Sequence, residues 1–194
     1  MTITNGYCTL AELKSALQKP TTDTVNDTWF ERCIESASRL IDQRTGRVFY
    51  SISLNGEILD IYNPNDNGIM VDGSGSRLLF PSPIIVVTSI YEDNILLTEN
   101  TDFYLYKNQG LIERDGYWTS NRKGTDTGIK LTLSYGYSSI PADIKGLCIQ
   151  LAKIFTGVAT RIVTDGSGGA MSFTLDSVPR WIVNEIDKHR RSYV

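Results

Sequence analysis

The sequence predicts an α+β protein in which a helical frame carries an inserted block of antiparallel strands. Apolar residues recur at helical spacing near both ends of the 194-residue chain, whereas the middle alternates apolar and polar residues. We expect four parts. Residues 1–47 hold the N-terminal helices, 48–137 the antiparallel β-rich insertion, 138–164 a core helix that packs on the N-terminal helices, and 165–194 a Gly-rich loop with a C-terminal helix.

Two capping boxes predict where the N-terminal helices begin. Thr9 with Glu12 marks the first helix, and Thr28 with Glu31 marks the second. Apolar residues of the second helix repeat at i, i+3, i+4 and i+7, so one face is expected to be buried. Gly46 supplies a C-terminal stop for this helix.

The β-rich block is expected to open with a hairpin. Asn55-Gly56 suits a two-residue type I′ turn, which pairs Ile52 with Leu59. Together the strands are sufficient for a small sandwich or open barrel. The further predicted strands cover residues 77–80, 84–91, 103–106, 111–113 and 129–137.

Two prolines locate the later helices. Pro141 favours the first turn of the core helix, and Pro179 lies in the first turn of a helix that starts near Asp176 or Ser177. The loop between these helices predicts a hinge built on Gly166, Gly168 and Gly169.

Composition argues against several classes of protein. The net charge of -3, from 19 basic and 22 acidic residues, disfavours broad binding to nucleic-acid phosphates. No apolar run reaches the roughly 18 residues of a membrane helix, and the first ten residues lack the pattern of a signal peptide. Cys8, Cys33 and Cys148 lack zinc-site spacing, and His189 is the only histidine. We therefore expect free buried thiols, a reducing compartment, and neither a metal site nor membrane insertion.

Catalytic motifs are missing from the sequence. It contains no nucleophile elbow, zinc-protease helix motif, Walker loop or dinucleotide-binding glycine pattern. The loop 73–77 leads into a predicted strand, so it indicates a turn rather than a phosphate site. We expect no catalytic residue and no cofactor.

Aromatic residues cluster around one predicted hairpin. Tyr104, Tyr106, Tyr117 and Trp118 either pack within the sheet or form a contact surface. The neighbouring polar loop carries Arg122 and Lys123, which we expect in solvent or at a partner-contacting tip.

Four segments of the chain follow one another in an informative order: residues 7–14, residues 31–50, the strand-to-helix junction at 134–145, and Val178-Pro179-Arg180 before a basic helix end. In this order they resemble the head-tail connector (adaptor) family of tailed bacteriophages. These segments belong to the helical frame. The β-rich block is long for the shorter members of that family.

The resemblance implies a structural virion protein and no enzymatic activity. In this family about twelve copies form a ring at the virion neck. The ring binds the portal on one side and a stopper or tail-completion protein on the other. Its axial channel passes genome DNA without sequence-specific binding, and it assembles in the host bacterial cytoplasm.

The resemblance also implies roles for two groups of residues. The C-terminal segment would dock onto the portal, and the polar faces of the first two helices would pair between subunits. For Trp181, a helix folded back on its own core is an equal alternative. The docking residues would be Arg180, Trp181, Lys188, His189, Arg190, Arg191 and Tyr193. The inter-subunit residues would be Lys14, Glu31, Arg32, Glu35, Arg39 and Asp42.

Two other functions remain open from the sequence. The aromatic cluster would also suit a carbohydrate- or ligand-binding β module of a phage or prophage structural protein. A hydrolase with an unfamiliar acid pair would require two carboxylates that only the fold could bring together.

Overall fold

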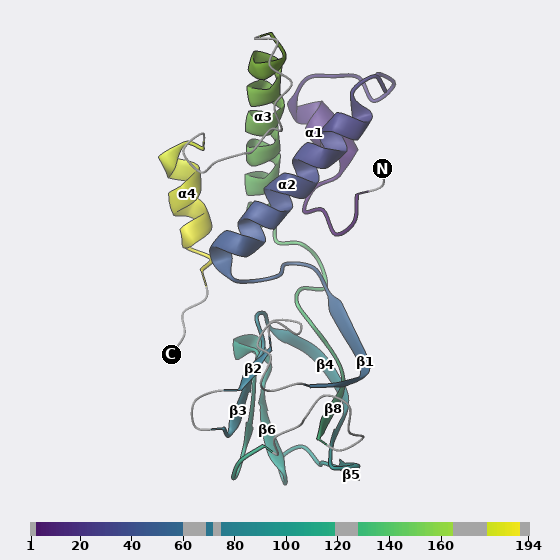
Figure 1. Cartoon of the computed structure of the whole chain (residues 1–194), viewed down its shortest axis with the longest axis vertical. Coiled ribbons are helices and arrows are strands. Elements are labelled where there is room, and N and C mark those ends of the chain that lie inside the picture. The colour runs from purple at the N-terminus through teal and green to yellow at the C-terminus, as the bar shows by residue number, and fades with distance from the viewer. Residues whose placement is uncertain (1–2, 60–68, 72–74, 119–127, 165–177, 191–194) are drawn as a thin grey trace. The chain divides into compact units, whose positions relative to one another are not determined.

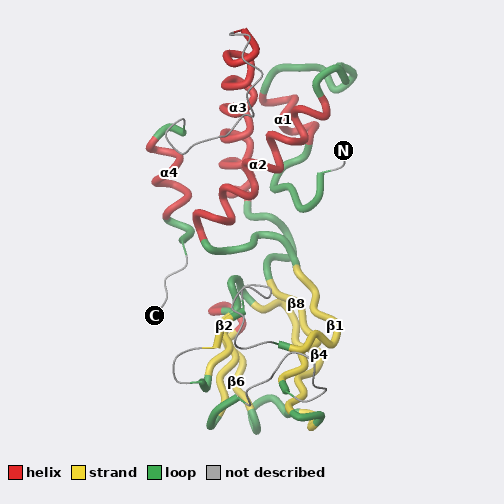
Figure 2. Tube along the Cα trace, viewed as in Figure 1, coloured by secondary structure: helices red, strands yellow, loops and turns green. Residues whose placement is uncertain are grey.

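The computed structural model describes residues 3–59, 69–71, 75–118, 128–164 and 178–190 (Figures 1 and 2). The chain forms two compact units. A helical unit combines residues 1–49 with 140–194, and a β unit comprises residues 50–139. Helices and antiparallel sheets are both present, which confirms the predicted α+β class.

The helical unit is built on a central pair of helices. α2 (Asp27–Thr45) packs against α3 (Ala142–Thr164), and both contact α1 (Leu10–Ala16) and α4 (Arg180–Asp187). Figure 1 shows α1 and α4 to either side of this pair. The packed faces carry the apolar positions with helical spacing, namely Cys33, Ile34, Ala37 and Ile41 of α2 and Ile144, Leu147, Cys148, Leu151 and Phe155 of α3.

The helix ends agree with the sequence only in part. The capping box of α1 is confirmed, because Glu12 N–H donates to Thr9 Oγ1 over 3.2 Å and Thr9 N–H donates to Glu12 Oε2 over 2.8 Å. Gly46 ends α2 in the left-handed conformation, with φ of 64°, as expected. The second capping box is wrong. α2 already begins at Asp27, so Thr28 lies inside the first turn and cannot cap it.

The β unit contains two four-stranded antiparallel sheets. In order across the first sheet, the strands are β1 (Ile52–Ile58), β8 (Ile129–Tyr135), β4 (Ile84–Glu92) and β5 (Ile95–Leu96). In order across the second sheet, they are β2 (Met70–Val71), β3 (Arg77–Leu79), β7 (Leu111–Arg114) and β6 (Phe103–Tyr106). A short 3-10 helix, Lys107–Gln109, links β6 to β7.

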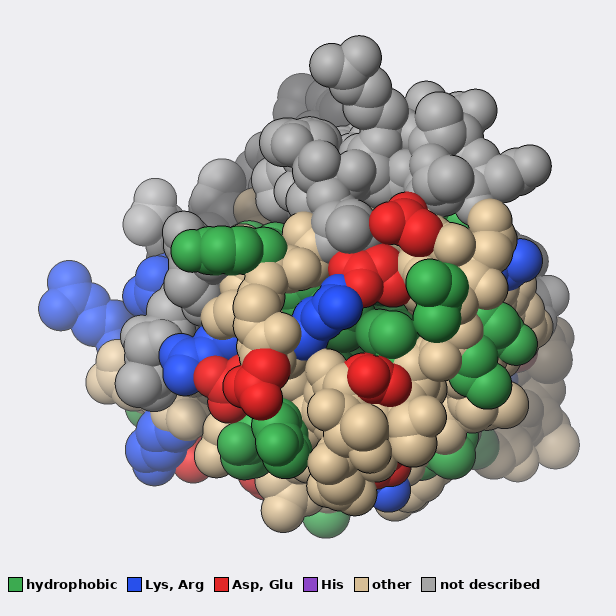
Figure 3. Space-filling view, turned by 90° about the horizontal axis from the view of Figure 1, so that it is seen from below, with side chains coloured by type: hydrophobic (Ala, Val, Ile, Leu, Met, Phe, Trp, Pro, Cys, Tyr) green, Lys and Arg blue, Asp and Glu red, His purple; other side chains and the backbone are tan. Residues whose placement is uncertain are grey.

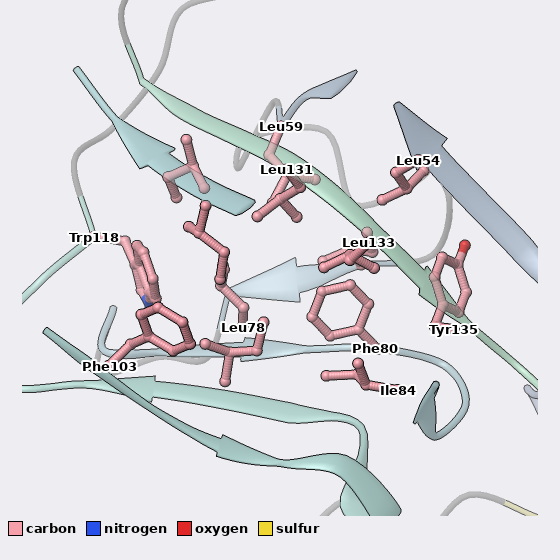
Figure 4. Packing of buried hydrophobic residues seen from close by; sticks show 14 residues of the cluster. Leu54, Leu59, Leu78, Phe80, Ile84, Phe103, Trp118, Leu131, Leu133 and Tyr135 are labelled. Atoms are coloured by element: carbon pink, nitrogen blue, oxygen red, sulfur yellow. The ribbon is translucent and has the colours of Figure 1, made fainter. Parts of the chain in front are cut away.

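The two sheets share one hydrophobic core. Leu131, Leu133 and Tyr135 of β8 project into the same buried cluster as Leu78 and Phe103 of the second sheet (Figure 4). An ion pair between Glu92 of β4 and Arg114 of β7 also joins the sheets. The arrangement is a small sandwich, one of the two forms that the sequence predicted.

The expected hairpin at Asn55-Gly56 is wrong. Both residues lie inside β1, which pairs along its length with β8, with Ile52 opposite Tyr135 and Asn55 opposite Thr132. Gly56, with φ of 69°, forms a bulge in this pairing, and its N–H donates to Thr132 Oγ1 over 3.1 Å. A bulge with left-handed backbone needs glycine for the same reason as a type I′ turn, so the two are alike in sequence.

Candidate interaction surface

α4 presents one buried face and one exposed face. Ile182 and Ile186 are buried, one helical turn apart, against α2 and α3. On the other side Trp181 is 60% exposed, beside Arg180 and Asn184, which are also exposed. An exposed tryptophan next to arginine is the composition typical of interface anchors. α4 is thus folded back on the helical unit, but the Trp181 side chain itself lies in solvent.

An ion pair holds α4 to α2. The Arg44 guanidinium donates from Nε to Asp187 Oδ1 and from its terminal nitrogen to Asp187 Oδ2, both over 2.7 Å. This bidentate contact holds the pKa of the Asp187 carboxyl below its usual range. Neither residue was among the expected site residues. Arg44 lies on the polar side of α2, where periodicity alone cannot identify its partner.

The docking residues expected at the end of α4 differ in their surroundings. His189 Nε2 lies 3.2 Å from Asp143 Oδ2 at the start of α3, and its ring meets Phe49 edge-on with centroids 6.2 Å apart. Its imidazole therefore belongs to contacts inside the helical unit. Lys188 and Arg190 are exposed, and Lys188 pairs with Glu185 over 2.6 Å. Arg191, Tyr193 and the hinge residues Gly166, Gly168 and Gly169 lie outside the described residues.

Lys14 does not lie on an exposed polar face. Its side chain is buried, and Nζ pairs with Asp27 Oδ1 over 2.5 Å and donates to the Thr21 carbonyl over 3.2 Å. A lysine this deeply buried requires such partners, because an uncompensated charge in the interior is costly. Its expected solvent-facing position on the first helix is therefore wrong.

The polar side of α2 makes contacts within its own unit. Arg39 pairs with Asp42 over 3.3 Å, donates to the Asn5 carbonyl over 3.0 Å and lies 5.9 Å above the Tyr7 ring. Glu35 is 4.0 Å from the same arginine. Arg32 is exposed and Glu31 half-buried. Arg39 and Asp42 are thus engaged in binding the N-terminal segment to α2.

The aromatic cluster of the β unit separates into exposed and buried members. Tyr104 and Tyr106 lie on the outward face of β6, and Tyr117 is 78% exposed. Trp118 is buried, donates from Nε1 to the Ser76 carbonyl over 2.9 Å and contacts Arg114. It is a core residue and does not join the exposed tyrosines. Arg122 and Lys123 lie outside the described residues.

Apolar side chains are also exposed at the turn between β4 and β5. Asp93 and Asn94 adopt left-handed backbone with φ of 49° and 66°, and Ile95 and Leu96 directly after them are exposed. Figure 3 shows hydrophobic side chains on one face of the molecule in separate patches among acidic and basic ones.

The described part of the chain was found to hold neither a cluster of metal ligands nor a membrane-spanning helix. Among these residues, no three His, Cys, Asp or Glu side chains are grouped so that they could hold a metal ion. Within the same ranges, no helix is both long and apolar enough to span a bilayer.

Comparison with known proteins finds a similar solved structure but no matching family model or curated protein. No model of a known protein family matches the sequence, and no curated protein matches it. Among solved structures, the chain is similar to one in the neck of an empty gene transfer agent (GTA) particle, computed with C6 symmetry. The TM-score is 0.57 at 15% sequence identity, and the match covers 100% of this chain and 94% of that chain. At 15% sequence identity, this likeness shows a shared fold and nothing more.

Proposed function

We propose that this chain is a structural protein of the neck of a phage-like particle, where it acts as a head-tail connector. The single observation that carries the proposal is the fold likeness to a chain of a GTA particle neck, which spans all of this chain. The order of segments that resembles the connector family is a second, independent support. Fold alone does not determine function, so the surface must supply the means of assembly.

The connector role would require self-association into a closed ring. A ring needs two different complementary faces on each subunit. About twelve copies, the number that the family resemblance implies, would be compatible with the C6 symmetry of the particle in which the similar chain was found. The exposed residues Arg32 of α2 and Ile95 and Leu96 of the β unit are available for such faces.

Portal docking is proposed for the exposed side of α4. Trp181 supplies a large apolar surface next to Arg180, and Lys188 and Arg190 are exposed basic residues after the end of the same helix. Since Ile182, Ile186 and the Arg44–Asp187 pair hold α4 on its own unit, docking would use the outward face of a helix that stays in place. A preordered helix binds without the entropy cost of folding on its partner.

Two consequences of the connector role are part of the proposal. The chain performs no catalysis, because its task is to join surfaces. Genome DNA passes through the channel without sequence-specific contacts, and the net charge of -3 is consistent with weak retention of the duplex.

Binding to the portal of the same particle tests the docking face. Trp181→Ala is expected to weaken capture of the portal by at least about tenfold, since truncating a central aromatic anchor typically has this effect. Tyr117→Ala is the matched control, because it removes an even more exposed aromatic side chain from the β unit. Equal affinities for both variants would contradict the docking assignment.

Electron microscopy of particles tests the location itself. An antibody against the chain should label the neck of intact particles, and native mass spectrometry of the chain with portal should reveal a closed oligomer. Absence of the chain from purified particles would contradict the connector role. The two tests are separate, because unchanged portal binding by Trp181→Ala would contradict the docking face and leave the neck location uncontradicted.

A further inference from the structure

Two cysteine side chains meet in the core of the helical unit. Cys8, in the segment before α1, and Cys148, in α3, place their Sγ atoms 3.5 Å apart, although 140 positions separate them in the sequence. Both side chains are buried and both thiols are free. A disulfide has an S–S length of about 2.05 Å, so closure requires an approach of only about 1.5 Å.

Neighbouring groups hold these two sulfur atoms close to each other. Ser38 Oγ of α2 lies 3.5 Å from Cys148 Sγ and accepts a hydrogen bond from the Tyr7 N–H over 3.0 Å. The same hydroxyl donates to the Ile34 carbonyl over 2.8 Å. The backbone next to Cys8 is therefore tied to α2 beside the partner thiol. The packing of the core therefore keeps the two thiols together, unlike two exposed thiols that meet only by chance.

The two thiols also differ in acidity. The contact with the Cys8 sulfur holds the pKa of Cys148 below its usual value, whereas the same contact and burial raise the pKa of Cys8. Cys148 is thus the member of the pair that carries negative charge more readily, and the thiolate is the form that attacks an oxidant. Cys33 of α2 offers a contrast, because burial raises its pKa to about 12.

We propose that Cys8 and Cys148 form an oxidisable dithiol, which hydrogen peroxide converts into an intramolecular disulfide between the N-terminal segment and α3. The Cys148 thiolate attacks one peroxide oxygen, so that an S–O bond forms and the O–O bond breaks. The leaving hydroxide takes up the proton that Cys148 lost on ionisation and departs as water. The Cys8 sulfur then attacks the sulfenic sulfur. An S–S bond forms, the S–O bond breaks, and the released hydroxide takes the proton of Cys8. Two thiols are oxidised and one peroxide is reduced to two waters.

The reaction requires access for a small oxidant. The segment 3–9 belongs to no helix or strand, and Cys8 lies in it. Local opening of this segment exposes the dithiol without unwinding α2 or α3. Neither the chemistry nor its test depends on the function proposed above.

Mass spectrometry of the full chain tests the proposal. Reduced protein is treated with hydrogen peroxide, denatured, alkylated and digested. The expected product has lost about 2 Da, contains a Cys8–Cys148 cross-linked peptide, and carries the alkyl group on Cys33 alone. Thermal unfolding should shift upward by about 5–10 °C, because the link closes a long loop, and dithiothreitol should reverse the shift.

Variants separate the pair from a general reactivity of buried thiols. Cys33→Ser should form the same disulfide at the same rate as wild type, whereas Cys8→Ser should stop at a sulfenic acid on Cys148 that a dimedone probe captures. If Cys8→Ser fails to fold, the wild-type and Cys33→Ser peptide maps still decide. The proposal is overturned if peroxide leaves all three thiols alkylated, links different chains, or consumes Cys33 as fast as the other two.

Discussion

At the scale of single residues, Tyr7 organises the N-terminal segment. Its hydroxyl donates to the Asp42 carboxylate and accepts a hydrogen bond from the Phe49 N–H over 2.9 Å. Its ring meets Phe49 edge-on at 5.7 Å. One tyrosine thereby connects the start of the chain, the polar side of α2 and Phe49, the last residue of the helical unit before the β unit begins. Burial raises the pKa of Asp42 to about 6, against the opposing effects of Tyr7 and Arg39.

We predict that Asp42 makes stability depend on pH in the unusual direction. A carboxyl whose pKa is about 6 when folded and 3.8 when exposed binds more protons in the folded state between these values. Its contribution to the free energy of unfolding therefore falls as pH rises through this window. Urea unfolding of wild type and Asp42→Asn at pH 5, 6 and 7 measures the difference between the two proteins.

Comparison with Asp42→Asn isolates this carboxyl from the other titrating groups. The pKa of Glu12 is lowered, chiefly by the Thr9 backbone, and that of Asp187 by Arg44, so the stability that both add with rising pH is gained below about pH 5. Wild type should lose stability relative to Asp42→Asn between pH 5 and 7. A constant difference across this range would contradict the assignment.

Two glycines provide a second prediction at this scale. Gly136 has φ of 107°, and a Cβ there would lie 2.0 Å from the Tyr50 carbonyl oxygen. Gly136→Ala should cost about 2–4 kcal/mol of unfolding free energy, since strain and a backbone clash combine. Gly146 lies in α3 with open space around it, so Gly146→Ala should instead stabilise by about 0.5–1 kcal/mol. Chemical denaturation measures both, and equal effects would refute the argument.

At the scale of elements, α4 depends on tertiary contacts for its existence. It has eight residues, too short for a stable isolated helix, and its N-cap residue, Pro179, makes no side-chain cap bond. Its order must come from burial of Ile182 and Ile186 and from the Arg44–Asp187 pair. The same contacts determine which side of α4 faces outward.

Ile186→Ala should therefore loosen α4 selectively. Removing a buried isoleucine side chain costs about 2–5 kcal/mol, and the loss falls on the docking of this one short helix. Hydrogen exchange followed by mass spectrometry should show faster exchange in residues 180–187, with α2 unchanged. Asn184→Ala, on the exposed side of the same helix, is the control and should leave exchange as in wild type.

At the scale of the whole molecule, the β unit is an insertion whose two ends lie next to each other. Ile52 at its start is paired with Tyr135 near its finish, so both connections to the helical unit leave from one end of two neighbouring strands. The unit also has a core of its own, which draws on both sheets. Chain ends that lie close together and a separate hydrophobic core are typical of a domain that can fold without the rest of the chain.

We predict that residues 50–139 fold when expressed alone. The isolated unit should give a β-type circular dichroism spectrum and one cooperative thermal transition, because its buried cluster lies entirely within this range. Leu133→Asp, which places a charge in that cluster, is the matched negative control. A non-cooperative transition in the wild-type unit would contradict the prediction.

Local patterns in the sequence predicted much of the fold. Periodicity identified α2, α3 and β8, because each has a buried face whose spacing is set by its own backbone geometry. Thr9, Glu12 and Gly46 marked helix ends through contacts that span at most four residues. The Asn55-Gly56 hairpin failed because a positive φ suits both a turn and a bulge, and only pairing with β8, more than 70 residues away, selects the bulge.

The sequence alone determined that the chain has helical ends around a strand-rich middle, since secondary structure follows from spacing along the backbone. Only the tertiary structure decided which polar side chains remain exposed. Lys14 and Asp42 looked like surface charges, yet they are bound inside the helical unit, whereas Trp181 is in solvent. The meeting of Cys8 with Cys148 was equally hidden. Such contacts join residues distant in the chain, and their distances exist only once the helices have packed.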